Sequence, residues 1–205
     1  MSSPIDLSLT EWCVLGLVAE RQTHGFAVSR EFAHDGPIGR IWTIPRPLVY
    51  RSIASLTVRG LVREVGSVPG ARGPERRMID TTPAGTAAIR SWLAVPVAHV
   101  RDARSELLVK LLLLDRCGED PLGLLEAQAA LLEPLLDSRR EQLSASEGFS
   151  STLARWRLYS AEAVARFVAE QITDLRQSTQ RTTNGRLSAA SDRTVEPDCA
   201  LDLGE

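Results

Sequence analysis

Residues 45–60 of the 205-residue chain read PRPLVYRSIASLTVRG. The two prolines suit the first turn of a helix, because a residue there needs no backbone N–H donor. Three apolar residues recur at helical spacing and would face a core together: Val49, Ile53 and Leu56. Gly60 is a typical helix stop. The stretch therefore predicts a helix over 48–59 with one buried side.

After Gly60 the pattern changes from a helical period to that of strands. Residues 61–65 and 76–81 are short runs of the kind found in strands, and the segment between them is rich in glycine and proline. Arginines stand near the tip of this turn-rich segment. We therefore expect a two-stranded hairpin with a basic loop directly after the helix.

Two further helices are expected before this stretch and one after it. Ser8 can cap the first of them, and Glu11 stands where it would complete a capping box. Residues 26–32 form a second amphipathic segment, and Thr82 can cap a helix that follows the hairpin. Three helices followed by a hairpin with a basic loop form the layout of a winged helix.

Pro96 marks the expected end of this unit, in a chain that we expect to be mainly α with a small β-hairpin. Residues 1–95 would form a winged helix-turn-helix domain, and residues 96–177 a helical, coiled-coil-like dimerisation domain. Residues 178–205 lose the apolar period and are rich in Ser, Thr, Arg and Asp, which predicts a disordered tail. Apolar residues at intervals of three and four would pack against a second copy. The candidate dimer contacts are Leu122, Leu125, Leu132, Leu136, Leu158, Val168, Ile172 and Leu175.

Positive charge is concentrated in one segment of the chain. The whole chain has a net charge of −2, with 24 basic and 26 acidic residues. Residues 40–77 nevertheless hold eight arginines against two acids, Glu64 and Glu75. Such a basic segment in a slightly acidic chain is typical of a surface that binds phosphate.

The predicted helix over 48–59 is the candidate DNA-recognition element, because this kind of fold reads bases with the first residues of one helix in the major groove. Arg51 could bind guanine through two hydrogen bonds, and Leu48 could contact a thymine methyl group. A solvated amphipathic helix with one arginine is the alternative interpretation. The side opposite the apolar stripe would face DNA, and it carries Leu48, Arg51, Ser52 and Ser55.

The hairpin would approach phosphates or the minor groove. Its candidate contacts, together with one at the start of the helix, are Arg46, Arg72, Gly73, Arg76 and Arg77. Because strand side chains alternate, Arg76 and Arg77 should point to opposite faces, so one of them is expected to be structural. The alternatives are a merely soluble charged hairpin, or a winged helix that docks a partner protein and oligomerises through its helical arm. A protein-docking wing should show an apolar patch rather than arginines.

Several motifs, in order from about residue 7 to residue 115, resemble the PadR family of transcriptional regulators. They are Leu9-Thr10-Glu11, Leu15-Gly16-Leu17, His24-Gly25-Phe26, the stretch 42–51, Gly60-Leu61-Val62, Gly73-Pro74-Glu75-Arg76-Arg77, Thr82-Pro83-Ala84-Gly85, Trp92-Leu93 and Lys110-Leu111-Leu112-Leu113. The sequence departs from the family at Pro47-Leu48, where glycine and threonine are usual, and at Ile79 and Thr81, where an aromatic residue and leucine are usual. These departures affect which operator sequence would be read more than DNA binding itself.

The resemblance implies a winged-helix repressor that dimerises through its C-terminal helices and binds a palindromic operator in double-stranded DNA. It also implies that Tyr50 contacts the DNA backbone, with a buried core tyrosine as the alternative. Related regulators bind flat aromatic or cationic molecules near the dimer interface, so a small effector of this kind would release the DNA. Trp156 is the candidate effector contact, because it lies in the region predicted to dimerise.

The sequence offers no catalytic constellation, and we expect no enzymatic activity, no cofactor and no bound metal. The three histidines lack the motif-spaced partners of a triad or a metal site: His24, His34 and His99. The three cysteines lie far apart, which fits a reducing compartment: Cys13, Cys117 and Cys199. With neither a signal peptide nor a membrane span in view, we expect a cytoplasmic protein.

Overall fold

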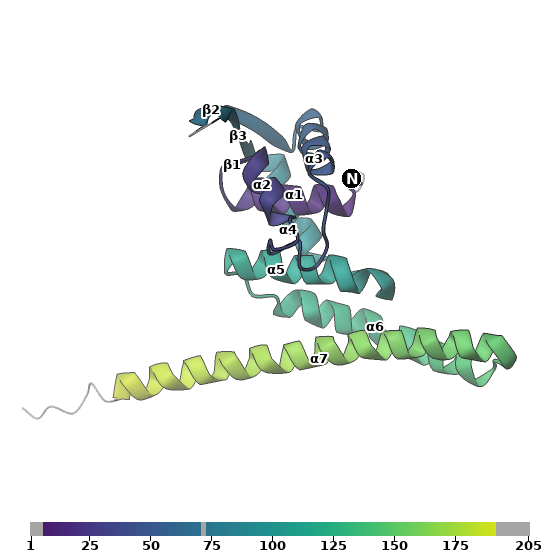
Figure 1. The fold of residues 1–205 in the computed structure, drawn as a ribbon. Helices are drawn as coiled ribbons and strands as arrows, with labels where there is room; N and C mark the ends of the chain where they lie inside the picture. The colour runs from purple at the N-terminus through teal and green to yellow at the C-terminus, as the bar shows by residue number, and fades with distance from the viewer. Residues whose placement is uncertain (1–5, 71–72, 192–205) are drawn as a thin grey trace, which may run out of the picture.

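The computed structural model of the protein describes residues 6–70 and 73–191. Its elements follow the winged-helix order, with a helical arm after them (Figure 1). In chain order they are α1 (Leu9–Glu20), β1 (Thr23–His24), α2 (Gly25–Glu31), α3 (Arg46–Val58), β2 (Val62–Gly70), β3 (Gly73–Thr81), α4 (Pro83–Ala94), η1 (Val100–Asp102), η2 (Ala103–Leu107), α5 (Leu108–Cys117), α6 (Leu122–Ser144) and α7 (Gly148–Ser191).

The helix starts follow from the local chemistry that the sequence indicates. Ser8 caps α1 and Glu11 completes the capping box, so this prediction is confirmed. Thr82 accepts a hydrogen bond from the N–H of Gly85 and caps α4 in the same way. His24 caps α2, with its ring nitrogen accepting from the N–H of Ala27 at 3.1 Å.

The sheet has three antiparallel strands in the order β1-β3-β2. The hairpin of β2 and β3 is longer than the sequence predicts, since strand pairing continues from Val62 with Thr81 to Gly70 with Gly73. The register shifts between Glu64 and Gly66, where the φ of Gly66 is 140°, a value that glycine adopts without strain. Strand β1 was not predicted, because two residues give no detectable period.

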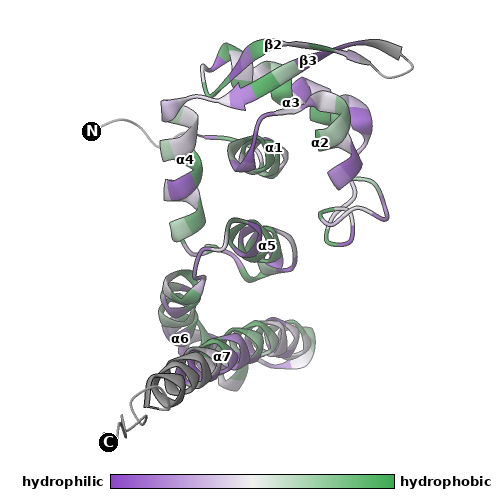
Figure 2. Cartoon of the chain, turned by 90° about the vertical axis from the view of Figure 1, so that its left-hand side faces the viewer, coloured by the Kyte–Doolittle hydropathy of each residue, from purple (hydrophilic) through white to green (hydrophobic). Residues whose placement is uncertain are grey.

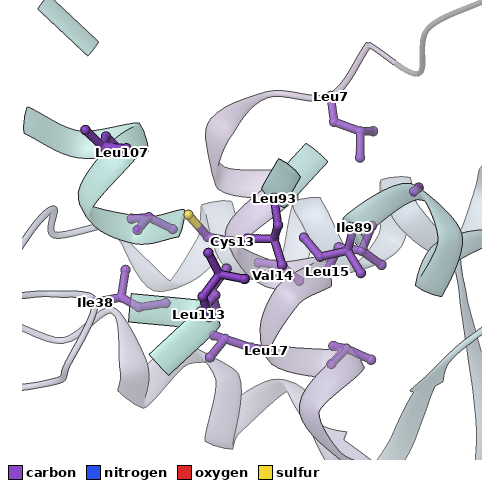
Figure 3. Close-up of a cluster of buried hydrophobic side chains, with 14 of the residues drawn as sticks. Leu7, Cys13, Val14, Leu15, Leu17, Ile38, Ile89, Leu93, Leu107 and Leu113 are labelled. Atoms are coloured by element: carbon purple, nitrogen blue, oxygen red, sulfur yellow. The ribbon is translucent and has the colours of Figure 1, made fainter. Parts of the chain in front are cut away.

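The core of the winged helix is built around α1, which contacts α3, α4 and α5. Cys13, Val14 and Leu15 are fully buried, and apolar residues from α4, η2 and α5 surround them (Figure 3). Gly16 lets α5 come close, because a Cβ there would lie 2.6 Å from a methyl carbon of Leu113. Helix α5 lies beyond the predicted boundary at 95, yet it belongs to the same continuous core.

Polar contacts also tie α5 to the winged helix. The Arg116 guanidinium binds both carboxylate oxygens of Glu20 at 2.7 Å and one oxygen of Glu31 at 2.8 Å. The side chain of Lys110 is 1% exposed and donates to the carbonyl of Val95 at 2.7 Å. Burial lowers the pKa of Lys110, against the opposite effect of the neighbouring Glu106 carboxylate at 2.9 Å.

The segment between α4 and η1 is held from α6 as well. Gln128 is buried, and its amide binds both backbone groups of Val97: its oxygen accepts from the N–H at 2.7 Å, and its nitrogen donates to the carbonyl at 3.1 Å. One side chain therefore fixes the backbone of Val97 to the first turns of α6. The division of the chain at residue 95 remains a prediction.

Helices α6 and α7 form an antiparallel hairpin whose facing sides are apolar. The residues predicted to contact a second copy lie mainly inside this hairpin. Four of them are buried within the chain, namely Leu125, Leu132, Leu158 and Val168, and the others are half-buried, namely Leu122, Leu136, Ile172 and Leu175. For the four buried residues the predicted dimer seam is corrected: they form the packing surface between α6 and α7, because apolar spacing does not specify which helix covers them. Contacts of the four half-buried residues with a second copy remain a prediction.

Helix α7 continues to Ser191, so the disordered tail predicted from residue 178 does not begin there. Residues 192–205 lie outside the described part of the chain. Figure 1 shows the C-terminal half of α7 extending well beyond α6. Across the described residues, no helix is both long and apolar enough to cross a membrane.

Candidate nucleic-acid interface

Helix α3 and the β2–β3 hairpin lie at one end of the molecule, and α6 and α7 lie at the other (Figure 2). The exposed side of α3 carries Arg46, Leu48, Tyr50 and Arg51. Helix α3 contains no acidic residue, and no ion pair of Arg51 is found among the described residues. This side is therefore free to meet a negatively charged surface.

Two of the predicted contacts on α3 do not lie on this side. Ser52 is 6% exposed, and it shares the buried side of the helix with Val49 and Leu56. Ser55 donates its hydroxyl to the Glu11 carboxylate of α1 at 2.6 Å. Ser55 therefore holds α3 against α1. The burial of Ser52 contradicts its assignment as a DNA contact, while that of the half-buried Ser55 stays an untested prediction.

The arginines of the hairpin have different surroundings. Arg77 pairs with Glu64 on the neighbouring strand at 3.2 Å, and its side chain stays exposed. Arg76 instead lies over the Phe26 ring of α2, 5.7 Å from its centre. Arg72 lies outside the described residues, and Gly73 begins β3 opposite Gly70. Among the described residues, Arg76 contacts the same Phe26 ring as Arg46 of α3.

We call the group formed by His24, Phe26, Arg46, Tyr50 and Arg76 the arginine–aromatic cluster. The Arg46 guanidinium lies 5.0 Å from the centre of the Phe26 ring and 5.6 Å from that of Tyr50. Arg46 also donates to the Tyr50 hydroxyl at 3.4 Å. Cation–π contacts of this kind hold long side chains in place while leaving their N–H groups available.

Tyr50 is exposed, in contrast to the buried core tyrosine that was the alternative. Its ring lies against Gly25, where a Cβ would approach it to 2.7 Å. Gly25 is thus required for Tyr50 to pack on α2 and to keep its hydroxyl beside Arg46. The backbone contact proposed for Tyr50 remains a prediction, but the hydroxyl is in a position to make it.

The cluster borders a groove of about 970 Å³ between α3 and the hairpin. Ile53 and Ile79 contribute apolar surface to it, and Glu64 and Glu75 contribute carboxylates. Both carboxylates are already engaged, since Glu64 pairs with Arg77 and Glu75 accepts a hydrogen bond from Ser67. Sequence reasoning missed His24 and Phe26, because their proximity to Arg76 depends on the pairing of the short strand β1 with β3.

A second cavity, of about 960 Å³, lies between the 98–108 segment and the α6–α7 hairpin. The predicted effector contact, Trp156, lines it together with Phe167. The lining also contains one histidine and four arginines, but no carboxylate among the described residues: His99, Arg101, Arg104, Arg139 and Arg157. Such a lining repels a cation, which argues against the cationic effector class.

Helix α7 exposes a row of large apolar side chains that the chain itself leaves uncovered. Phe149 is 80% exposed and Trp156 is 71% exposed, and Leu153 and Tyr159 lie between and beyond them on the same helix. Their spacing of four, three and three residues places them on one side of α7. We call this row the α7 aromatic stripe.

The structure groups no three metal-binding side chains within the described residues. Cys13 is buried, which raises the pKa of its thiol to about 12, so it stays protonated at neutral pH. Cys117 is exposed, and Cys199 lies outside the described residues.

No protein-family model and no curated protein matches the sequence. Solved structures are similar to the chain over most of its length. A crystal structure of Bacillus subtilis PadR with operator DNA is 15% identical, covers 82% of this chain and 99% of its own, and has a TM-score of 0.42. A second crystal structure of that PadR is 15% identical, with coverages of 85% and 99% and a TM-score of 0.37.

The PadR-like transcriptional regulator of Bacillus cereus is 15% identical, covers 88% of this chain and 99% of its own, and has a TM-score of 0.39. By its own elements the chain is a winged helix with a helical arm.

Proposed function

We propose that the protein is a transcriptional regulator that binds an inverted-repeat operator as a homodimer, with no catalytic role. The observation that carries this proposal is the exposed side of α3, which presents Arg51 without an ion-pair partner beside the arginine–aromatic cluster. A helix with a free arginine near its start, flanked by a hairpin, fits the major groove and the adjoining phosphates.

In this proposal Arg51 reads guanine through two hydrogen bonds, and Leu48 contacts a thymine methyl group. Arg46, Tyr50 and Arg76 bind the DNA backbone and fix the position of α3 in the groove. Arg77 stabilises the hairpin through Glu64. A bidentate arginine–guanine contact contributes about 1–3 kcal/mol of discrimination between bases.

The homodimer would form through the α7 aromatic stripe rather than through the buried seam between α6 and α7. Exposed aromatic residues on one side of a long helix are typical anchors of protein interfaces. A twofold axis would then place two copies of α3 about 34 Å apart, or a multiple of that distance, to match successive turns of DNA.

An effector would bind in the arginine-lined cavity beside Trp156 and release the operator, so that the regulator acts as a repressor. The charge of the lining favours a small anion with an apolar body. The cavity lies between the 98–108 segment and the α6–α7 hairpin, so that an occupant would alter how the arm meets the winged helix.

The test is selection of DNA from a random pool by the full-length chain, followed by binding measurements at several salt concentrations. We expect an inverted repeat, bound more tightly than random DNA. Arg51→Ala should lose about 5- to 150-fold of that preference, corresponding to about 1–3 kcal/mol. Ser55→Ala is the matched control, because Ser55 faces α1 and its removal should leave the preference unchanged.

A chain without preference for any repeat would contradict specific regulation, and an Arg51→Ala protein with full preference would contradict the assignment of α3. One observation favours the alternative of protein docking: Val58 is 89% exposed beside the groove, with Phe26 and Tyr50 nearby. That alternative predicts that Val58→Asp abolishes the function while DNA selection yields nothing.

A further inference from the structure

The hydrogen bonds of His24 determine which of its ring nitrogens carries the proton. Nδ1 accepts the N–H of Ala27 at 3.1 Å as the cap of α2, so its lone pair is occupied. A neutral imidazole has one N–H and one acceptor nitrogen. The proton of the neutral ring therefore lies on Nε2, which points away from the cap.

The Nε2 atom faces another donor. Arg76 Nη1 lies 3.4 Å from it, and a guanidinium group has N–H donors but no acceptor. Two donors at this distance cannot satisfy each other. An acceptor oxygen placed between them would accept from both groups at once.

The surroundings favour an anionic oxygen. Arg46 and Arg76 both lie within 6 Å of the centre of the Phe26 ring, at 5.0 and 5.7 Å. Neither arginine forms an ion pair among the described residues. Of the two carboxylates of the groove, Glu64 pairs with Arg77 and Glu75 accepts a hydrogen bond from Ser67. Two positive charges therefore lie close together here, and no acceptor among the described residues lies between Arg76 and the Nε2–H of His24.

We propose that His24 Nε2–H and Arg76 together bind one non-bridging phosphate oxygen of the DNA backbone, with Arg46 supplying additional charge. This inference rests on the proposed function and adds His24 to the DNA contacts. The histidine has two tasks: one nitrogen caps α2, and the other contacts the phosphate. The phosphate would lie where α2, α3 and the hairpin meet, so it would fix the hairpin relative to α3.

His24→Asn separates these two tasks, because asparagine is a good helix cap but cannot supply the Nε2 donor. His34→Asn is the matched control, since His34 is exposed and lies outside the cluster. With DNA selected by the wild-type chain, we expect His24→Asn to bind about 3- to 10-fold more weakly, as for the loss of one hydrogen bond. Because the neutral ring carries no charge, the dependence of log K on log salt should keep its slope.

Arg76→Gln gives a different signature, because it removes a charge. Affinity should fall, and the salt slope should decrease by about 0.9, the value for one phosphate contact. The two substitutions should not be additive, since both donors bind the same oxygen. Replacing that phosphate by a neutral methylphosphonate should weaken the wild type and leave His24→Asn without a further loss.

The ring can also be observed directly by nitrogen NMR of the full chain. We expect the Nε2–H form of His24 without DNA and a shift of its Nε2 resonance on addition of the selected DNA. The Nδ1–H form, or unchanged binding by His24→Asn, would overturn this inference. Inorganic phosphate is the probe for a free anion, and a ring that responds to it but not to DNA would overturn the assignment to the backbone. A wild-type chain that binds no DNA would instead overturn the proposed function.

Discussion

The winged helix with α5 and the α6–α7 hairpin use the same kind of apolar spacing with different results. In the first region α1 is covered on nearly every side by helices of its own chain, and Leu15 and Leu113 are fully enclosed. In the second region the facing sides of α6 and α7 cover each other, but the α7 aromatic stripe stays exposed. The enclosed side chains of the first region therefore stabilise the fold, whereas the exposed side chains of the α7 aromatic stripe are available for assembly.

The largest effect is expected in the enclosed region. Leu113→Ala removes a side chain that fills the space left by Gly16, so the free energy of unfolding should fall by about 2–5 kcal/mol. Urea denaturation should show this loss equally at low and high protein concentration. Leu153→Ala on the exposed stripe is the control and should change the stability of the isolated chain little. Equal losses for the two variants would remove the distinction between the regions.

A somewhat smaller effect is expected in assembly. Trp156→Ser should leave the fold intact but raise the dimer dissociation constant by about 30-fold or more, as for an interface hot spot of about 2 kcal/mol. Sedimentation over a range of concentrations measures this change. Val58→Ser, which removes an exposed apolar side chain from α3, should not alter assembly. An unchanged dimer in Trp156→Ser would show that α7 associates through another surface.

The smallest effect concerns the polar contact that holds α3 on α1. Burial raises the pKa of Glu11, but hydrogen bonds from Ser55 and Ser8 lower it more, so the net pKa lies below the ordinary value of 4.5. The unfolded chain therefore binds this proton more readily, and the stabilisation is present above pH 4.5 and lost as the pH falls through the lowered folded value. Glu11→Gln should cost about 1 kcal/mol at neutral pH.

The measurement is the urea midpoint between pH 7 and pH 3. Below pH 4.5 the wild type should lose stability more steeply than Glu11→Gln, and the two curves should converge. A constant difference between them at every pH would mean that the carboxylate charge has no part in the contact. Ser55→Ala keeps the carboxylate and should shift the curve less.

Secondary-structure elements that depend on neighbouring residues were predicted correctly. Side-chain burial that depends on packing against another segment was not. The capping box of Ser8 and Glu11 and the helix–hairpin order depend on neighbouring residues, and they are confirmed. The face of α3 was misjudged because Ser52, rather than Ile53, is the residue buried with Val49 and Leu56. The apolar spacing of residues 48–59 does not reveal that a serine lies on the buried side.

The same limit applies to the arm and to the cluster. A row of leucines spaced three and four apart predicts that a helix is covered, but it cannot tell a neighbouring helix from a second copy. The burial of Lys110 was equally unpredictable, since one of its two partners, the carbonyl of Val95, is a backbone group. The contact of Arg76 with His24 depends on the register between β1 and β3. A strand of two residues, such as β1, has no sequence pattern that predicts this register.

The two hydrogen bonds between Gln128 and Val97 make the start of α6 a pivot for the rest of the helix. From Gln128 to the end of α6 at Ser144 the helix is about 24 Å long, at about 1.5 Å per residue. Over this length, a tilt of α6 by about 10° at Gln128 would move its far end by about 4 Å. The α7 helix and its aromatic stripe begin directly beyond that end. A small shift of the Val97 backbone would therefore change the spacing between the two winged helices of a dimer by a larger amount.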